Sequence, residues 1–120
     1  MALPKSLSPK APKNELDKLA EVMLMNGAWK RLLNEVEVLL RAGRYREALA
    51  KLQQDPQLYQ YVVASMINAL NSYPGGRISD LSGNVYSTAE LANMLRQGKW
   101  LPVHFNFLLS EIDIIQRQLG

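Results

Sequence analysis

The sequence predicts an all-α protein, a compact bundle of five or six helices with a small β-hairpin-like connector at about 77–86. Apolar residues recur at helical three- and four-residue spacing along most of the 120 residues. Capping residues, glycines and prolines divide these stretches into segments joined by short connections. Only YPGGRISDLSGNVYSTAELA, residues 73–92, departs from this pattern, because glycines and hydroxyl side chains are concentrated there.

The first helical stretch covers residues 14–42. Asn14 can cap its start, and Gly43 ends it, as glycine does where a helix needs a left-handed residue. Asn26-Gly27 interrupts the stretch, yet the apolar phase continues across the interruption. One long helix and two shorter helices therefore both fit residues 14–42. The residues that keep the phase are Val22, Met25, Trp29, Leu32 and Val36.

Two further helices are expected between Arg44 and Ser72. The first is RYREALAKLQQ, residues 44–54. Asp55-Pro56 then begins the second, since aspartate is a good N-cap and proline is tolerated in a first helical turn. Pro74 and the two glycines after it close this helix. Its expected core stripe is Leu58, Val62, Met66 and Leu70.

The connector and two more helices complete the chain. Gly83-Asn84 is a two-residue turn signal for a hairpin, and Ser87 with Glu90 forms a capping box that begins a short helix. The last helical segment, residues 99–119, is apolar on two sides, which indicates a central position or a shared interface. Its main stripe is Leu101, Phe105, Leu108, Leu109, Ile112, Ile115 and Leu119; its second stripe is Val103, Phe107 and Ile114.

Charge separates the chain into two parts. Residues 1–13 contain Lys5, Lys10 and Lys13, three prolines and no acid, which predicts a disordered basic tail. Residues 14–120 have equal numbers of basic and acidic side chains and form the single helical domain. The isoelectric point near 9.3 therefore reflects the tail alone. A domain that neutralises several phosphates should carry a positive excess of its own.

Composition also limits the location and the chemistry. The chain has no cysteine, which excludes disulfides, thiolate catalysis and cysteine-ligated metals. It has no apolar run long enough for a membrane span, and residues 1–13 lack the features of a signal or transit peptide. We therefore expect a cytoplasmic protein without membrane contact.

No group of residues has the spacing expected of a catalytic site. His104 is the only histidine and has no spaced acid partner for a dyad. The acid pairs Glu35/Glu37 and Glu111/Asp113 are two residues apart, a spacing at which helical side chains diverge. The glycines of residues 75–84 match neither the P-loop pattern nor the dinucleotide-binding pattern. We expect no catalytic residues, cofactor or metal, and no enzyme.

Two short stretches resemble known helical families. LLRAGRYREALAKL resembles the turn of a tetratricopeptide repeat at Gly43, Tyr45 and Ala48, which implies a packed antiparallel helical hairpin; no second copy exists. STAELANML resembles the first helix of a helix-turn-helix unit. Arg96 stands where that unit has its turn glycine, and the following helix is too apolar to read DNA.

Two groups of residues are candidates for binding. Aromatic and apolar residues exceed what one core stripe per helix requires, and such residues concentrate at protein interfaces. We expect a regulatory or accessory module that binds another protein or a second copy of itself through these residues: Trp100, Phe107, Ile114 and Tyr59. The less favoured alternative is a nucleic-acid-associated protein that uses the lysine tail and a basic patch of Arg41, Arg44, Arg46 and Lys51.

Overall fold

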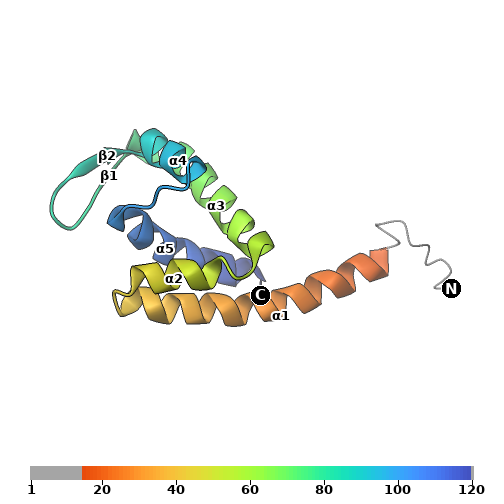
Figure 1. The fold of residues 1–120 in the computed structure, drawn as a ribbon. Coiled ribbons are helices and arrows are strands. Elements are labelled where there is room, and N and C mark those ends of the chain that lie inside the picture. Colours follow the sequence, from red (N-terminus) through yellow and green to blue (C-terminus); the bar gives the residue numbers. More distant parts are fainter. Residues whose placement is uncertain (1–14, 120) are drawn as a thin grey trace.

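The fold is mostly helical, with one small hairpin (Figure 1). The structure, a computed structural model, describes the backbone of residues 15–119 and side chains from residue 27 onward. The expected tail of residues 1–13, with Lys5, Lys10 and Lys13, and the expected cap Asn14 lie outside the described residues. The elements are α1 (Glu15–Arg41), α2 (Tyr45–Leu52), α3 (Pro56–Asn71), the 3₁₀ turn η1 (Pro74–Gly76), β1 (Arg77–Ser79), β2 (Val85–Ser87), α4 (Thr88–Arg96) and α5 (Pro102–Leu119).

Helix α1 is a single helix that runs through Asn26-Gly27 without a break. The continuous apolar phase therefore outweighs the poor helix propensity of those two residues. Gly43 has a φ of +77°, as its role as a helix-ending residue predicts. The chain then reverses, and α2 packs along the end of α1 (Figure 1). The packed helical hairpin implied by residues 39–52 is confirmed.

Asp55 caps α3 and also ties it to α1. Its Oδ1 atom accepts a hydrogen bond from the Leu58 backbone N–H (N–O 3.0 Å), so the predicted N-cap is confirmed. Its Oδ2 atom accepts a second hydrogen bond, from the Trp29 indole N–H (3.1 Å). One carboxylate thus fixes the start of α3 against the middle of α1.

The hairpin forms with a longer loop than the sequence predicts. Strands β1 and β2 are antiparallel, and Ile78 pairs with Tyr86. The expected two-residue turn at Gly83-Asn84 is wrong, because Ser79 pairs with Val85 and five residues connect them. The predicted cap is confirmed, since Ser87 Oγ accepts from the Glu90 N–H (3.3 Å).

Asp80 organises this five-residue loop. Its carboxylate accepts hydrogen bonds from the backbone N–H groups of Ser82 and Asn84, the Asn84 side-chain amide and the Tyr86 hydroxyl. These bonds, above all the one from the Asn84 amide, hold the pKa of Asp80 below its ordinary value. The carboxylate therefore replaces the tight glycine turn as the feature that closes the hairpin.

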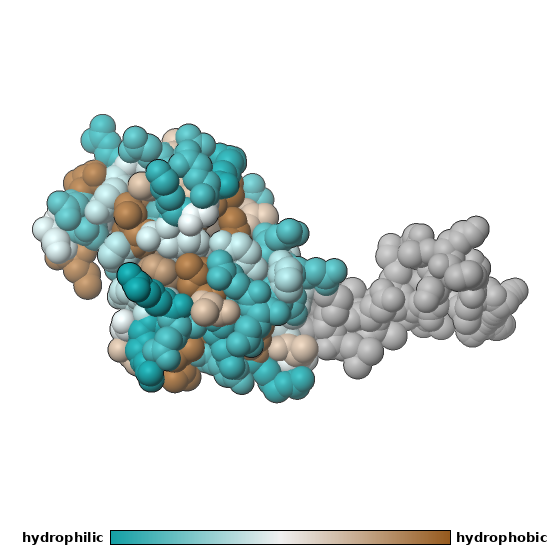
Figure 2. Space-filling view, in the orientation of Figure 1, coloured by the Kyte–Doolittle hydropathy of each residue, from teal (hydrophilic) through white to brown (hydrophobic). Residues whose placement is uncertain are grey.

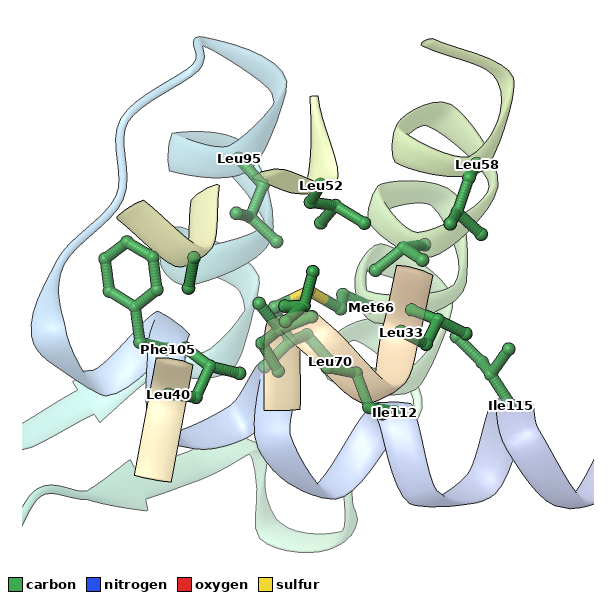
Figure 3. Packing of buried hydrophobic residues seen from close by; sticks show 14 of the residues in the cluster. Leu33, Leu40, Leu52, Leu58, Met66, Leu70, Leu95, Phe105, Ile112 and Ile115 are labelled. Carbon is green, nitrogen blue, oxygen red and sulfur yellow. The ribbon is translucent and has the colours of Figure 1, made fainter. Parts of the chain in front are cut away.

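The core lies between α5 and the other four helices (Figure 3). The main stripe of α5 enters it with Phe105, Leu108, Ile112 and Ile115, as the sequence predicts. These side chains meet the apolar faces of α1 and α3, which places α5 centrally. The other buried apolar residues are Leu33, Val36, Leu40, Ala48, Leu52, Leu58, Val62, Met66, Leu70, Leu91, Ala92, Leu95 and Val103.

Candidate functional site

Helix α5 presents candidate binding residues on two opposite sides. Successive residues of an α-helix are rotated by about 100°, so Phe105 and Phe107 point about 160° apart. Phe105 stacks on Tyr45 of α2, whereas Phe107 contacts Tyr73 at the end of α3. Two separate surfaces therefore adjoin α5, and the predicted interface residues are divided between them.

The first surface is the α3–α5 seam, formed by Tyr61, Ser65, Tyr73, Phe107, Glu111, Ile114 and Gln118. Three contacts along the seam join α3 and α5. Later residues of α5 contact earlier residues of α3, because the two helices are antiparallel. The rings of Tyr73 and Phe107 lie 6.3 Å apart in an edge-on arrangement. Ser65 donates to the buried Glu111 carboxylate (2.9 Å), and the Tyr61 hydroxyl donates to Gln118 Oε1 (3.4 Å).

Ile114 is the apolar centre of the seam's exposed edge. It lies one helical turn from both Glu111 and Gln118, on the same side of α5 as Phe107. Its side chain is 46% exposed, while Phe107 is half-buried against the core. Ile114 is therefore available to a partner, whereas Phe107 also supports the fold.

A cleft extends the seam toward the hairpin. Its volume is about 400 Å³, and Tyr73, Ile78, Leu81 and Phe107 contribute apolar surface to its walls. Leu81, in the loop that Asp80 closes, is 97% exposed. Figure 2 shows apolar surface in brown at the hairpin end of the molecule, on the left. The seam and this cleft share Tyr73 and Phe107, so they adjoin each other.

The other two interface candidates lie elsewhere. The Trp100 indole N–H donates to the Tyr59 hydroxyl (3.3 Å), and both residues are half-buried at the edge of the core. The structure thus brings Trp100 and Tyr59 together, and Phe107 and Ile114 together, on different sides of α5.

The second surface is the aromatic groove, formed by Tyr45, Leu49, Trp100, Pro102 and Phe105 with Arg44, Arg46 and Glu47 at its rim. The Tyr45 and Phe105 rings stack in parallel at 4.9 Å, and the Trp100 ring lies 5.1 Å from Phe105. The groove encloses about 730 Å³. Gly43 and Gly98, which end helices with positive φ, also line it.

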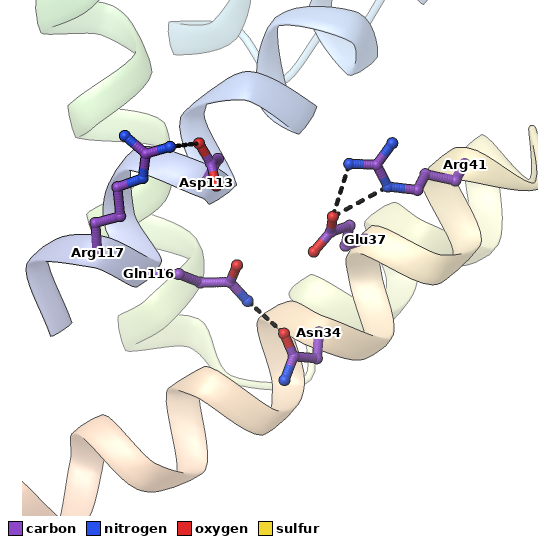
Figure 4. Close-up of polar contacts among 6 residues, drawn as sticks. All are labelled: Asn34, Glu37, Arg41, Asp113, Gln116 and Arg117. Carbon is purple, nitrogen blue, oxygen red and sulfur yellow. Dashed lines mark hydrogen bonds and ion pairs between the residues drawn. The ribbon is translucent and has the colours of Figure 1, made fainter. Parts of the chain in front are cut away.

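The predicted basic patch is largely neutralised. Arg41 binds Glu37 (2.9 Å; Figure 4), Lys51 binds Glu35 (2.9 Å), and Arg44 pairs with Glu47. Arg46 is exposed, and no ion pair engages it within the described part of the chain. Two of these pairs are local in sequence, whereas Glu35 lies sixteen positions before Lys51 and meets it only through the α1–α2 hairpin.

His104 connects α5 to the end of the loop before it and to α4. Its Nδ1 atom accepts from the Leu101 N–H (2.8 Å), so Nε2 carries the proton and donates to the Leu91 carbonyl (3.0 Å). The side chain is only 1% exposed. Burial lowers its pKa, an effect that the bond to Leu91 opposes. Both nitrogens are engaged, so His104 ties the start of α5 to α4.

The buried, neutral His104 predicts a loss of stability in mild acid. The unfolded chain takes up this proton near the ordinary pKa of 6.5, whereas the folded protein resists it. The free energy of unfolding should therefore fall below about pH 6.5, by at most about 1.4 kcal/mol per pH unit, until the folded pKa is passed. Urea titrations at several pH values would measure this slope. His104→Gln should remove it; an unchanged slope in the variant would assign it to other groups.

The remaining candidates for catalysis stay apart. Glu111 is buried against Ser65, while Asp113 is exposed and pairs with Arg117 (3.0 Å; Figure 4). The two carboxylates diverge around α5, as their spacing predicts. Within residues 27–119, no three histidine or acidic side chains gather in a way that could hold a metal ion.

Beyond Trp100, Phe107, Ile114 and Tyr59, four other residues contribute to these surfaces. Tyr61 and Tyr73 belong to the seam, Leu81 lines the cleft, and Tyr45 lines the groove. Tyr61 and Tyr73 lie on α3 or just after it, outside its buried stripe, which is a usable sequence signal for exposure. Leu81 has no such signal, because its exposure follows from the loop that Asp80 organises.

Among the described helices, none has a stretch both long and apolar enough to cross a membrane. Comparison with protein-family models, with curated proteins and with solved structures finds no match to this chain.

Proposed function

We propose that this protein is a small non-enzymatic interaction module that binds another protein, or a second copy of itself, through the α3–α5 seam. The observation that carries the proposal is the clustering of exposed apolar side chains. Six large apolar residues are exposed in residues 27–119, and four of them, Tyr61, Tyr73, Leu81 and Ile114, lie on the seam or its cleft. Exposed apolar residues concentrated in one region of a surface are typical of protein interaction sites.

The composition of the seam fits an interface. Two tyrosines and a phenylalanine provide large, rigid contact areas, and aromatic residues are enriched at the centres of protein interfaces. Polar groups of Ser65, Glu111 and Gln118 are already engaged within the seam, so docking does not leave them newly unpaired. A regulatory or accessory role in the cytoplasm agrees with the absence of cysteine.

The nucleic-acid alternative has less support. Three of the four cations in the Arg41–Lys51 patch are paired with carboxylates. A phosphate backbone would have to compete with those acids, and the domain has no net positive charge to compensate.

Ile114→Asp should abolish self-association without unfolding the protein. A charge at the centre of a desolvated interface is costly, whereas Ile114 contributes little to the core because it is 46% exposed. Light scattering after size-exclusion chromatography should show the wild-type mass rising with concentration and the variant remaining a monomer. Val38→Asp is the matched control, since Val38 is 67% exposed on α1 outside the seam.

A wild-type protein that stays monomeric at high concentration would contradict self-association. Docking of a different protein would then be tested by photo-cross-linking in cells, with a photoreactive residue at position 114 or at position 38. Adducts from position 114 alone would support the seam. Equal labelling from both positions, or none, would overturn the proposed function.

A further inference from the structure

The unpaired charged side chains in the aromatic groove and next to it in the chain are cations. Arg46 is exposed with no ion pair, and the Tyr45 hydroxyl has no hydrogen-bond partner within the described residues. Lys99 lies between the groove residues Gly98 and Trp100, and it is likewise exposed and unpaired. All three are hydrogen-bond donors, and two carry positive charge.

The acidic side chain at the rim does not change this balance. Glu47 is bound by the Arg44 guanidinium through two nitrogens, Nε and Nη2. The third nitrogen of Arg44 remains available for another acceptor. The charge that the groove offers to a ligand is therefore positive, although the domain as a whole is neutral.

The floor of the groove requires an apolar anchor. The stacked Tyr45 and Phe105 rings and the adjacent Trp100 ring line the groove together with Arg44 and Arg46. An aromatic or aliphatic side chain fits such a floor, because aromatic pairs add about 0.5–1.5 kcal/mol to the effect of burial. A complementary occupant therefore combines an apolar side chain with nearby negative charge.

We propose that the aromatic groove binds an acidic segment of a partner protein, with an apolar side chain packed on Tyr45, Trp100 and Phe105 and flanking carboxylates held by Arg46 and Lys99. Charge complementarity favours this occupant over a basic or neutral one. It also favours a peptide over a nucleic acid, since two unpaired cations beside a carboxylate suit a few carboxylates better than a continuous phosphate backbone.

This proposal does not depend on the seam. The groove lies on the opposite side of α5, and the substitutions below do not alter any seam residue. Binding at the groove can therefore be absent while the seam binds a partner, and binding at the seam can be absent while the groove binds its peptide.

Selection from a random displayed-peptide library on the full chain tests the groove without assuming a sequence. We expect enriched peptides to carry an aromatic or aliphatic residue flanked by aspartate or glutamate. Arg46→Glu and Lys99→Glu should each weaken binding of a fluorescein-labelled enriched peptide about tenfold or more, and added salt should weaken it further. Arg77→Glu is the matched control, because it makes the same charge change on the hairpin and should leave affinity unchanged.

Three outcomes would overturn the proposal. The first is enrichment of basic or uncharged peptides, or of none. The second is equal loss of binding in Arg46→Glu and Arg77→Glu, which would indicate a general charge effect. The third is a labelled single-stranded oligonucleotide that binds more tightly than the acidic peptides and loses that binding in Arg46→Glu, which would assign the groove to nucleic acid.

Discussion

Ile112→Ala is expected to lower the free energy of unfolding by about 2–5 kcal/mol. Ile112 is fully buried on α5, where it meets the core side chains of α1 and α3 (Figure 3). The substitution removes three buried carbon atoms, so the free energy gained by burying them is lost. It also leaves a cavity in a closely packed core, which lowers stability further. Urea denaturation of dilute protein, followed by far-ultraviolet circular dichroism, would measure the change.

Ile114→Ala is the control within the same helix. The residue type and the deletion are identical, but Ile114 is 46% exposed, so the loss should stay below about 1 kcal/mol. Dilute conditions matter, because self-association through Ile114 would add apparent stability to the wild-type protein. Equal losses in the two variants would contradict the assignment of a buried and an exposed face to α5.

Asp55→Ala is expected to lower the free energy of unfolding by about 2.5–4 kcal/mol, because two hydrogen bonds are lost together. An N-cap contributes about 1 kcal/mol, and a hydrogen bond to a charged group about 1.5–3 kcal/mol. The carboxylate of Asp55 supplies both, to the Leu58 backbone and to the Trp29 indole. The same denaturation measurement applies, with tryptophan fluorescence as a second probe.

Two further variants separate the contributions of Asp55. Asp55→Asn retains a capping oxygen but no charge, and its amide cannot serve both donors, so we expect a smaller loss than with alanine. Trp29→Phe retains the cap and removes only the indole donor. A stability of Asp55→Ala within about 0.5 kcal/mol of the wild type would contradict the dual role.

The helices could be predicted from the sequence because their causes are local. Apolar spacing, the Asp55-Pro56 start and the glycine at position 43 act within one or two turns, and each was confirmed. The Gly83-Asn84 turn was predicted wrongly, because the Asp80 carboxylate offers the loop several hydrogen bonds that turn propensities do not count.

The two candidate surfaces beside α5 could be predicted only in part. Ile114 and Phe107 were recognised because they form a second stripe on one helix. Tyr45 and Phe105 are sixty positions apart, and no spacing rule relates them; only the packing of α2 on α5 does. Pairing of Lys51 with Glu35 likewise depends on tertiary structure, so a patch that is basic in sequence is nearly neutral in space.

The central position of α5 has a consequence for synthesis on the ribosome. The apolar faces of α1 and α3 are covered by residues 102–119, which are made after all the other elements. Until those residues emerge, the nascent chain exposes Leu33, Val36 and Met66 to water and to other chains. Such intermediates are prone to aggregation, so the growing chain should be a chaperone substrate until its last helix is complete.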